Sequence, residues 1–114
     1  MPHFILDCSP DLFANCERKQ LLQRVNDVAQ STGLFAPANI KVRLRVFDDY
    51  LTAGSDDSFI HVFAYIMEGR TNEQKSALSI AVVGELKTMF PDVPVISLNV
   101  MDFEKASYHN RETV

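Results

Sequence analysis

The amino-acid sequence predicts an α+β domain built from two strand–helix–strand units. Two segments with helical periodicity each lie between two segments with the residue pattern of strands. A polar segment, residues 48–58, separates the two units near the middle of the 114 residues. We therefore expect one domain with an internal repeat, covering about residues 2–47 and 59–103, in which four strands form one sheet with both helices on one face.

The first unit begins with a short strand over residues 2–7, which a turn at Cys8-Ser9-Pro10 ends. A helix is predicted over residues 17–32, because apolar residues recur there at helical spacing and Gly33 suits its C-terminal cap. From residue 40 to residue 46, apolar and cationic residues alternate with the period of a strand. This alternation places Lys41, Arg43 and Arg45 on one side of the sheet.

The second unit begins with residues 59–67, which are apolar on both faces and therefore predict a central strand that is covered on both sides. Thr71 with Gln74 three positions later is typical of a capping box, so a helix is predicted from there to Pro91. Its expected buried stripe comprises Ala77, Leu78, Ala81, Val82, Leu86, Met89 and Phe90. Residues 95–103 predict the last strand, and residues 104–114 show no clear pattern.

Composition and charge narrow the possible functions. Hydrophobic residues make up 46% of the chain, and the net charge of −4 argues against general binding to nucleic acid. The N-terminus lacks the pattern of a secretory leader, and no apolar run approaches about 18 residues, so a cytoplasmic protein without membrane contact is expected. Cys8 and Cys16 are expected to be free thiols, because their spacing fits neither a metal site nor a disulfide framework.

Pro2 is the residue with the most specific chemical potential. Removal of Met1 would expose its nitrogen as a free secondary amine, and an α-amino group titrates near about pH 8. Nearby cations and an apolar pocket would lower that pKa, so the neutral amine could accept a proton at neutral pH. Taken alone, however, a proline at this position more often only begins a strand.

Two short segments resemble a known family. Residues 1–9, Met-Pro-His-Phe-Ile-Leu-Asp-Cys-Ser, are similar to the start of 5-carboxymethyl-2-hydroxymuconate isomerases. Residues 68–75, which begin Glu-Gly-Arg, are similar to 4-oxalocrotonate tautomerases. The resemblance covers about residues 2–103 and implies one tautomerase-like domain, with a fold like that of macrophage migration inhibitory factor, in a homotrimer. It also implies an isomerase that needs no cofactor and acts in the breakdown of aromatic acids, such as homoprotocatechuate degradation.

The resemblance also assigns the expected site residues. Pro2 would move the proton, and Arg70 would bind a substrate carboxylate and stabilise the dienolate, so both are predicted to be catalytic. Lys41 and Arg43 are predicted to bind substrate carboxylates, although Lys41 stands where these isomerases carry an arginine. The residues themselves also permit a plainer interpretation, in which the cations of this strand face solvent or pair with acids.

Three functions therefore remain open at the level of sequence. The first is ketonisation of 5-carboxymethyl-2-hydroxymuconate or a similar 2-hydroxydienoate. The second is a related reaction on another unsaturated acid, which Lys41 makes reasonable because a lysine binds a carboxylate without a bidentate fork. The third is a non-catalytic binding module of ferredoxin-like type. We expect His3 and His61 to be structural, and no residue spacing indicates a metal or nucleotide site.

Overall fold

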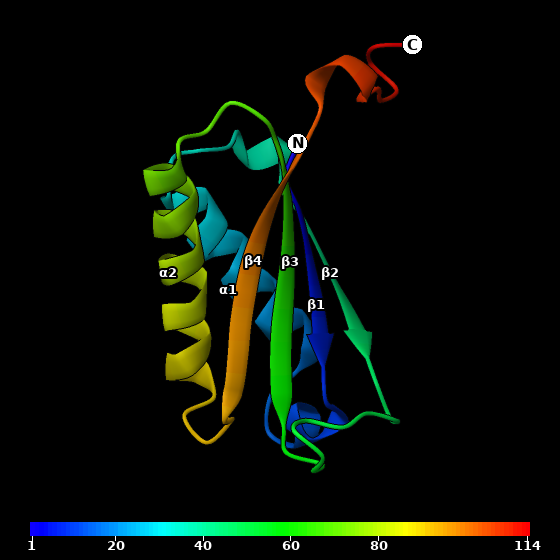
Figure 1. The fold of residues 1–114 in the computed structure, drawn as a ribbon, viewed down its shortest axis with the longest axis vertical. Helices are drawn as coiled ribbons and strands as arrows, with labels where there is room; N and C mark the ends of the chain where they lie inside the picture. Colours follow the sequence, from blue (N-terminus) through cyan, green and yellow to red (C-terminus); the bar gives the residue numbers. More distant parts are fainter.

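The computed structural model describes residues 1–114 and contains one four-stranded sheet with two long helices against it (Figure 1). The strands are β1 (His3–Cys8), β2 (Lys41–Val46), β3 (Phe59–Met67) and β4 (Val95–Phe103), and the helices are α1 (Arg18–Ser31) and α2 (Asn72–Met89). Short 3-10 helices occupy Pro10–Ala14, Pro37–Asn39 and Lys105–Ser107. The predicted fold class and all six long elements are confirmed, with bounds that shift by one or two residues.

The topology consists of two β-α-β units placed side by side. The strand order is β2-β1-β3-β4, with β1 parallel to β2 and β3 parallel to β4, while β1 and β3 pair in antiparallel fashion. Parallel neighbours need a crossover connection, which α1 supplies in the first unit and α2 in the second. The antiparallel pair at the centre joins the two units into one sheet.

The hydrophobic core lies between the helices and one face of the sheet. Alternate residues of β1 and β3 are fully buried there, among them Phe4, Leu6, Ile60 and Val62. The helices contribute Leu21, Val25, Ala29, Leu78, Val82 and Leu86. The predicted stripe of the second helix was wrong at Ala77, which is exposed, because α2 contacts the sheet mainly through residues four positions apart.

The opposite face of the sheet has no helix over it. The β3 residues that point there are only half-buried: Phe59, His61, Phe63, Tyr65 and Met67. The prediction of a central strand is confirmed, since β3 lies between β1 and β4. Both helices cross on the same side of the sheet, as expected (Figure 1), so cover of the other face of β3 stays a prediction that requires another copy of the chain.

Local signals fix the ends of the helices. Thr71 and Gln74 form the predicted capping box at the start of α2, in which the Thr71 hydroxyl accepts from the Gln74 amide at 3.1 Å. Gly33 follows α1 with φ +72°, a left-handed conformation that glycine adopts without a steric penalty. No helix in the structure has the length and apolar content needed to cross a membrane.

Candidate active site

The first two residues lie at the end of the sheet where β1 begins. Pro2 is buried, and its carbonyl oxygen accepts a hydrogen bond from the Lys41 amide at 3.1 Å. This bond continues the pairing of β1 with β2 and holds the residue in a fixed position. In the chain as it stands, the Pro2 nitrogen is part of the peptide bond to Met1, so only removal of Met1 would turn it into an amine.

The α-amino group of the chain lies in cationic surroundings. Burial, followed by the charges of Arg70 and Lys41, lowers the pKa of the Met1 amine below its ordinary value. The Lys41 Nζ atom lies 4.0 Å from the Met1 sulfur and donates to the Asn39 carbonyl at 2.9 Å. The Met1 amine is therefore shifted toward its neutral, proton-accepting form.

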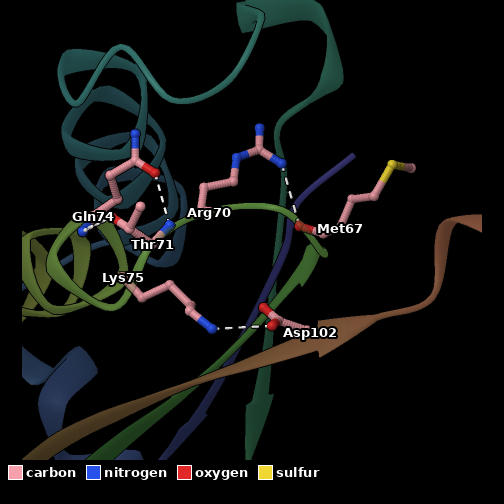
Figure 2. Close-up of polar contacts among 6 residues, drawn as sticks. All are labelled: Met67, Arg70, Thr71, Gln74, Lys75 and Asp102. Carbon is pink, nitrogen blue, oxygen red and sulfur yellow. Dashed lines mark hydrogen bonds and ion pairs between the residues drawn. The ribbon is translucent and has the colours of Figure 1, made fainter.

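Arg70 is held in place by backbone carbonyls from two different segments. Its Nη2 donates to the Leu34 carbonyl at 2.7 Å. Its Nη1 donates to the Met67 carbonyl at 3.3 Å (Figure 2). The guanidinium also lies 5.2 Å from the centre of the Phe35 ring. These contacts use two of the five N–H donors of the guanidinium, and the other three remain available to a ligand.

A hollow of about 500 Å³ opens at this end of the sheet. Its walls come from the N-terminus, the loop before β2, the end of β3 with its turn, and the C-terminal segment: Met1, Asn39, Met67, Arg70, Lys105, Tyr108, His109, Asn110 and Thr113. No acidic residue lines it, although acids outnumber Lys and Arg by 15 to 11 in the chain. The hollow is therefore suited to an anionic ligand.

Lys75 is close in sequence to Arg70 but is already neutralised. Its Nζ forms an ion pair with an oxygen of Asp102 at 3.0 Å, which ties the first turn of α2 to the end of β4 (Figure 2). The contrast matters because Arg70 has only carbonyl partners and keeps its net positive charge. Of these two cations on one turn, Arg70 is the one with charge to offer a ligand.

Arg43 lies in a neighbouring hollow on the open face of the sheet. This hollow measures about 390 Å³ and is lined by His3, Ile5, Arg43, Tyr65, Phe103 and Tyr108. The Arg43 Nη1 lies 3.2 Å from the His3 Nδ1, and burial with the charges of Arg43 and Lys41 lowers the pKa of His3. Lys41 and Arg70 thus lie near the Met1 amine, and Pro2 is hydrogen-bonded to the Lys41 amide, while Arg43 stands apart in a hollow that shares only Tyr108 with the first.

Two residues from the sequence analysis have structural partners. Arg45 pairs with Asp7 through two hydrogen bonds of 2.7 and 3.2 Å, as the plainer interpretation of this strand suggests. His61 lies 2.6 Å from the Ser97 hydroxyl and 2.7 Å from the Asn99 side-chain oxygen. Both lie on the open face, and neither lines the hollow at the N-terminus.

The C-terminal segment is the part of the site that sequence reasoning missed. Five of its residues line the hollow, yet residues 104–114 have no periodicity or motif that distinguishes them from a solvated tail. A larger hollow of about 690 Å³ lies at the other end of the sheet, lined by residues 13–20. Its lining includes one acidic residue, Glu17, and two basic residues, Arg18 and Lys19, so the hollow does not favour a ligand of either charge. The structure contains no cluster of three or more His, Cys, Asp or Glu side chains that could hold a metal ion.

Comparison with known families agrees with this geometry. The family model for 5-carboxymethyl-2-hydroxymuconate isomerase matches residues 2–111. The chain belongs to this family. A curated relative, the 5-carboxymethyl-2-hydroxymuconate Delta-isomerase of Escherichia coli, is 27% identical over 111 residues, which cover 96% of this chain and 88% of the relative. Membership of this isomerase family supports an isomerase role for the chain.

Solved structures confirm the tautomerase fold of this family member. The protein Pt0534, solved after inactivation by 2-oxo-3-pentynoate, superposes with a TM-score of 0.85 at 25% identity, covering 98% of this chain and 94% of its own. The fused 4-OT designated W0, a symmetric trimer, superposes with a TM-score of 0.77 at 17% identity, covering 98% and 96%. The second likeness bears on the fold alone.

Proposed function

We propose that this chain ketonises 5-carboxymethyl-2-hydroxymuconate or a similar 2-hydroxydienoate, with the Pro2 nitrogen as the proton carrier. The observation that carries the proposal is the position of the N-terminus. It lies in a hollow without acidic residues, and burial together with the charges of Arg70 and Lys41 lowers the pKa of the Met1 amine there. A lowered pKa favours the neutral form of such an amine, which can act as a base, while the same cations attract a carboxylate substrate.

The proposed reaction moves one proton and needs no cofactor. The lone pair of the Pro2 nitrogen takes the proton of the 2-hydroxyl group, which leaves a dienolate. The dienolate electrons then form a bond from the far carbon of the diene to a proton returned by the Pro2 ammonium, and the oxygen becomes a carbonyl. Arg70 stabilises the negative charge as it spreads along the conjugated system, which lowers the barrier for both transfers.

Lys41 and Arg43 are proposed to bind substrate carboxylates. Lys41 projects beside Met1, so its ammonium is close enough to contact a substrate held at the N-terminus. It offers a point charge, which leaves the orientation of the carboxylate less constrained than a guanidinium would. That feature favours, as a second candidate, a related tautomerase reaction on a different unsaturated acid. Arg43 could take part only with a substrate long enough to reach the neighbouring hollow.

We further propose that the chain is a cytoplasmic homotrimer. The open face of the sheet carries the half-buried side chains Phe59, Phe63, Tyr65 and Met67, which would gain burial against another copy. The fused 4-OT with the same fold is a symmetric trimer. Analytical ultracentrifugation should give a species of about three times the mass of the chain, and a stable monomer at micromolar concentration would contradict this assembly.

The decisive experiment follows the ultraviolet absorbance of 5-carboxymethyl-2-hydroxymuconate. Protein whose mass confirms the loss of Met1 is compared with the Pro2→Ala variant at equal concentration. We expect the absorbance to decay rapidly with the parent protein and the rate to fall by about 10²–10⁴-fold in the variant, the range typical of a lost general acid–base group.

Protein that retains Met1 is the matched control, because it keeps every side chain and lacks only the free proline amine. It should be as slow as Pro2→Ala. Equal rates for Pro2→Ala and the parent protein would contradict the mechanism. Absence of turnover with any form, alongside activity on another unsaturated acid, would favour the second candidate function.

A further inference from the structure

The C-terminal segment is fastened to the turn that carries Arg70. The Glu68 carboxylate accepts a hydrogen bond from the Lys105 amide at 2.7 Å, so residue 68 of the Glu-Gly-Arg turn holds the segment where it leaves β4. The rings of Phe103 and Tyr108 stack with their centres 5.0 Å apart and an angle of 24° between them. Figure 1 shows the segment beyond the end of the sheet at which the N-terminus lies.

The end of the segment is closed by its own hydrogen bonds. The Asn110 side-chain oxygen accepts from the amides of Glu112 and Thr113 at 2.9 and 3.2 Å, and the Thr113 hydroxyl accepts from the Asn110 amide at 3.0 Å. His109 lies 3.3 Å from the same hydroxyl through its Nδ1. Residues 105–113 therefore have a defined conformation, and this conformation forms one wall of the hollow.

Lys105 is the cation that this wall adds. Three ion pairs are present in the structure, and the Lys105 ammonium belongs to none of them. The acids of the segment, Glu104 and Glu112, do not line the hollow. Its lining thus includes Arg70, which follows the end of β3, and Lys105 from the C-terminal segment, while Lys41 lies beside Met1.

We propose that Lys105 is a specificity-determining residue that binds the carboxymethyl carboxylate of the substrate. The inference rests on the proposed function, which supplies an anion with three carboxylates, two on the muconate chain and one on the carboxymethyl branch. Arg70 and Lys41 account for two of these charges, and Lys105 is the other Lys or Arg that lines the hollow of Arg70, whereas Arg43 lines the neighbouring hollow. The C-terminal segment therefore selects the branched triacid over diacids that lack the branch.

The test compares two substrates that differ only in the branch, 5-carboxymethyl-2-hydroxymuconate and 2-hydroxymuconate. In Lys105→Gln, we expect KM for the triacid to rise about fivefold, which corresponds to about 1 kcal/mol, with kcat unchanged. KM for the diacid should stay within about twofold of the parent value. Lys105→Arg, which keeps the charge, should retain the parent KM for both substrates.

Lys87→Gln is the matched control, because it removes the same charge from the last turn of α2 and Lys87 does not line the hollow. It should leave both KM values unchanged. An unchanged KM for the triacid in Lys105→Gln, or an equal rise for both substrates, would overturn the inference.

A binding measurement separates this inference from the proposed function. Isothermal titration of the triacid into Pro2→Ala, with and without Lys105→Gln, reports affinity in protein whose turnover of the ligand is expected to be about 10²–10⁴-fold slower than that of the parent. We expect the dissociation constant to rise about fivefold when the lysine is lost. Failure of turnover in the parent protein together with this difference would refute the proposed reaction and retain the role of Lys105. Equal affinities would overturn the role of Lys105 even if the reaction is observed.

Discussion

Replacement of Arg70 by glutamine tests two contributions of this side chain, one to the stability of the fold and one to catalysis. The structural part follows from two hydrogen bonds to backbone carbonyls, of Leu34 and Met67, at a half-buried position. Bonds to a charged group contribute about 1.5–3 kcal/mol when buried, and partial exposure reduces this, so we expect a loss of about 1–2 kcal/mol in the free energy of unfolding. For a chain of this length, the melting temperature should fall by about 4–8 °C.

The catalytic part should be much larger. Loss of one donor that stabilises a developing oxyanion lowers kcat by about 10²–10³-fold, and we expect a fall of this size in kcat/KM for the proposed dienol. Arg70→Lys keeps the positive charge but loses the two parallel N–H donors with which a guanidinium binds a carboxylate. Its activity should therefore lie between those of the parent protein and Arg70→Gln. The assay is the decay of dienol absorbance, measured at a temperature at which circular dichroism shows all three proteins folded.

The pH dependence gives a second, independent readout of the same change. Burial and then the charge of Arg70 lower the pKa of the Met1 amine, and we expect the same charge to act on the Pro2 amine once Met1 is removed, so loss of Arg70 should raise that pKa. Activity that requires the neutral amine is lost as the pH falls, and this acid limb should move to higher pH in Arg70→Gln. A folded variant with kcat/KM within about threefold of the parent value and an unmoved acid limb would refute the role of Arg70.

Three further changes test other parts of the structure. Thr71→Ala removes the capping box of α2 and should cost about 1 kcal/mol in the free energy of unfolding, measured by urea denaturation; an unchanged value would contradict the cap. Burial and the charges of Arg43 and Lys41 lower the pKa of His3 in the folded protein. The free energy of unfolding should therefore decrease as the pH falls below about 6.5, and this pH dependence should be weaker in His3→Gln. Burial raises the pKa of Cys8 to about 12, so Ellman's reagent at pH 8 should label at most Cys16 in the native protein and both thiols after denaturation; rapid native labelling of both would contradict the burial.

The order and approximate limits of the elements could be predicted from the sequence because they depend on local interactions. The alternation of residues 40–46 and the helical spacing in residues 17–32 each follow from which side chains can face one core. The capping box at Thr71 and the left-handed Gly33 are determined within a few residues. Pro2 and Arg70 were selected through the family resemblance, and the family assignment itself is now shown.

Tertiary structure decided which side chains meet. Lys41 and Arg43 share one face of a strand. The Lys41 ammonium nevertheless lies beside Met1, whereas the Arg43 guanidinium lies against His3 in a separate hollow. A spacing of two residues along a strand places both side chains on the same face of the sheet. The neighbouring strands and loops then determine what surrounds each side chain. The same reasoning explains Ala77, which helical periodicity places near the core and the crossing of α2 over the sheet leaves exposed.

The C-terminal segment shows the limit of local information most clearly. Residues 104–114 carry no pattern that predicts a place beside the N-terminus, because the contact that fastens them, from the Lys105 amide to the Glu68 carboxylate, joins residues 37 positions apart in the chain. By itself, the sequence determined a two-unit α+β chain and a proline that could become an amine. Only the folded chain brought Arg70, Lys41 and Lys105 around that end, since such contacts join segments that no periodicity connects.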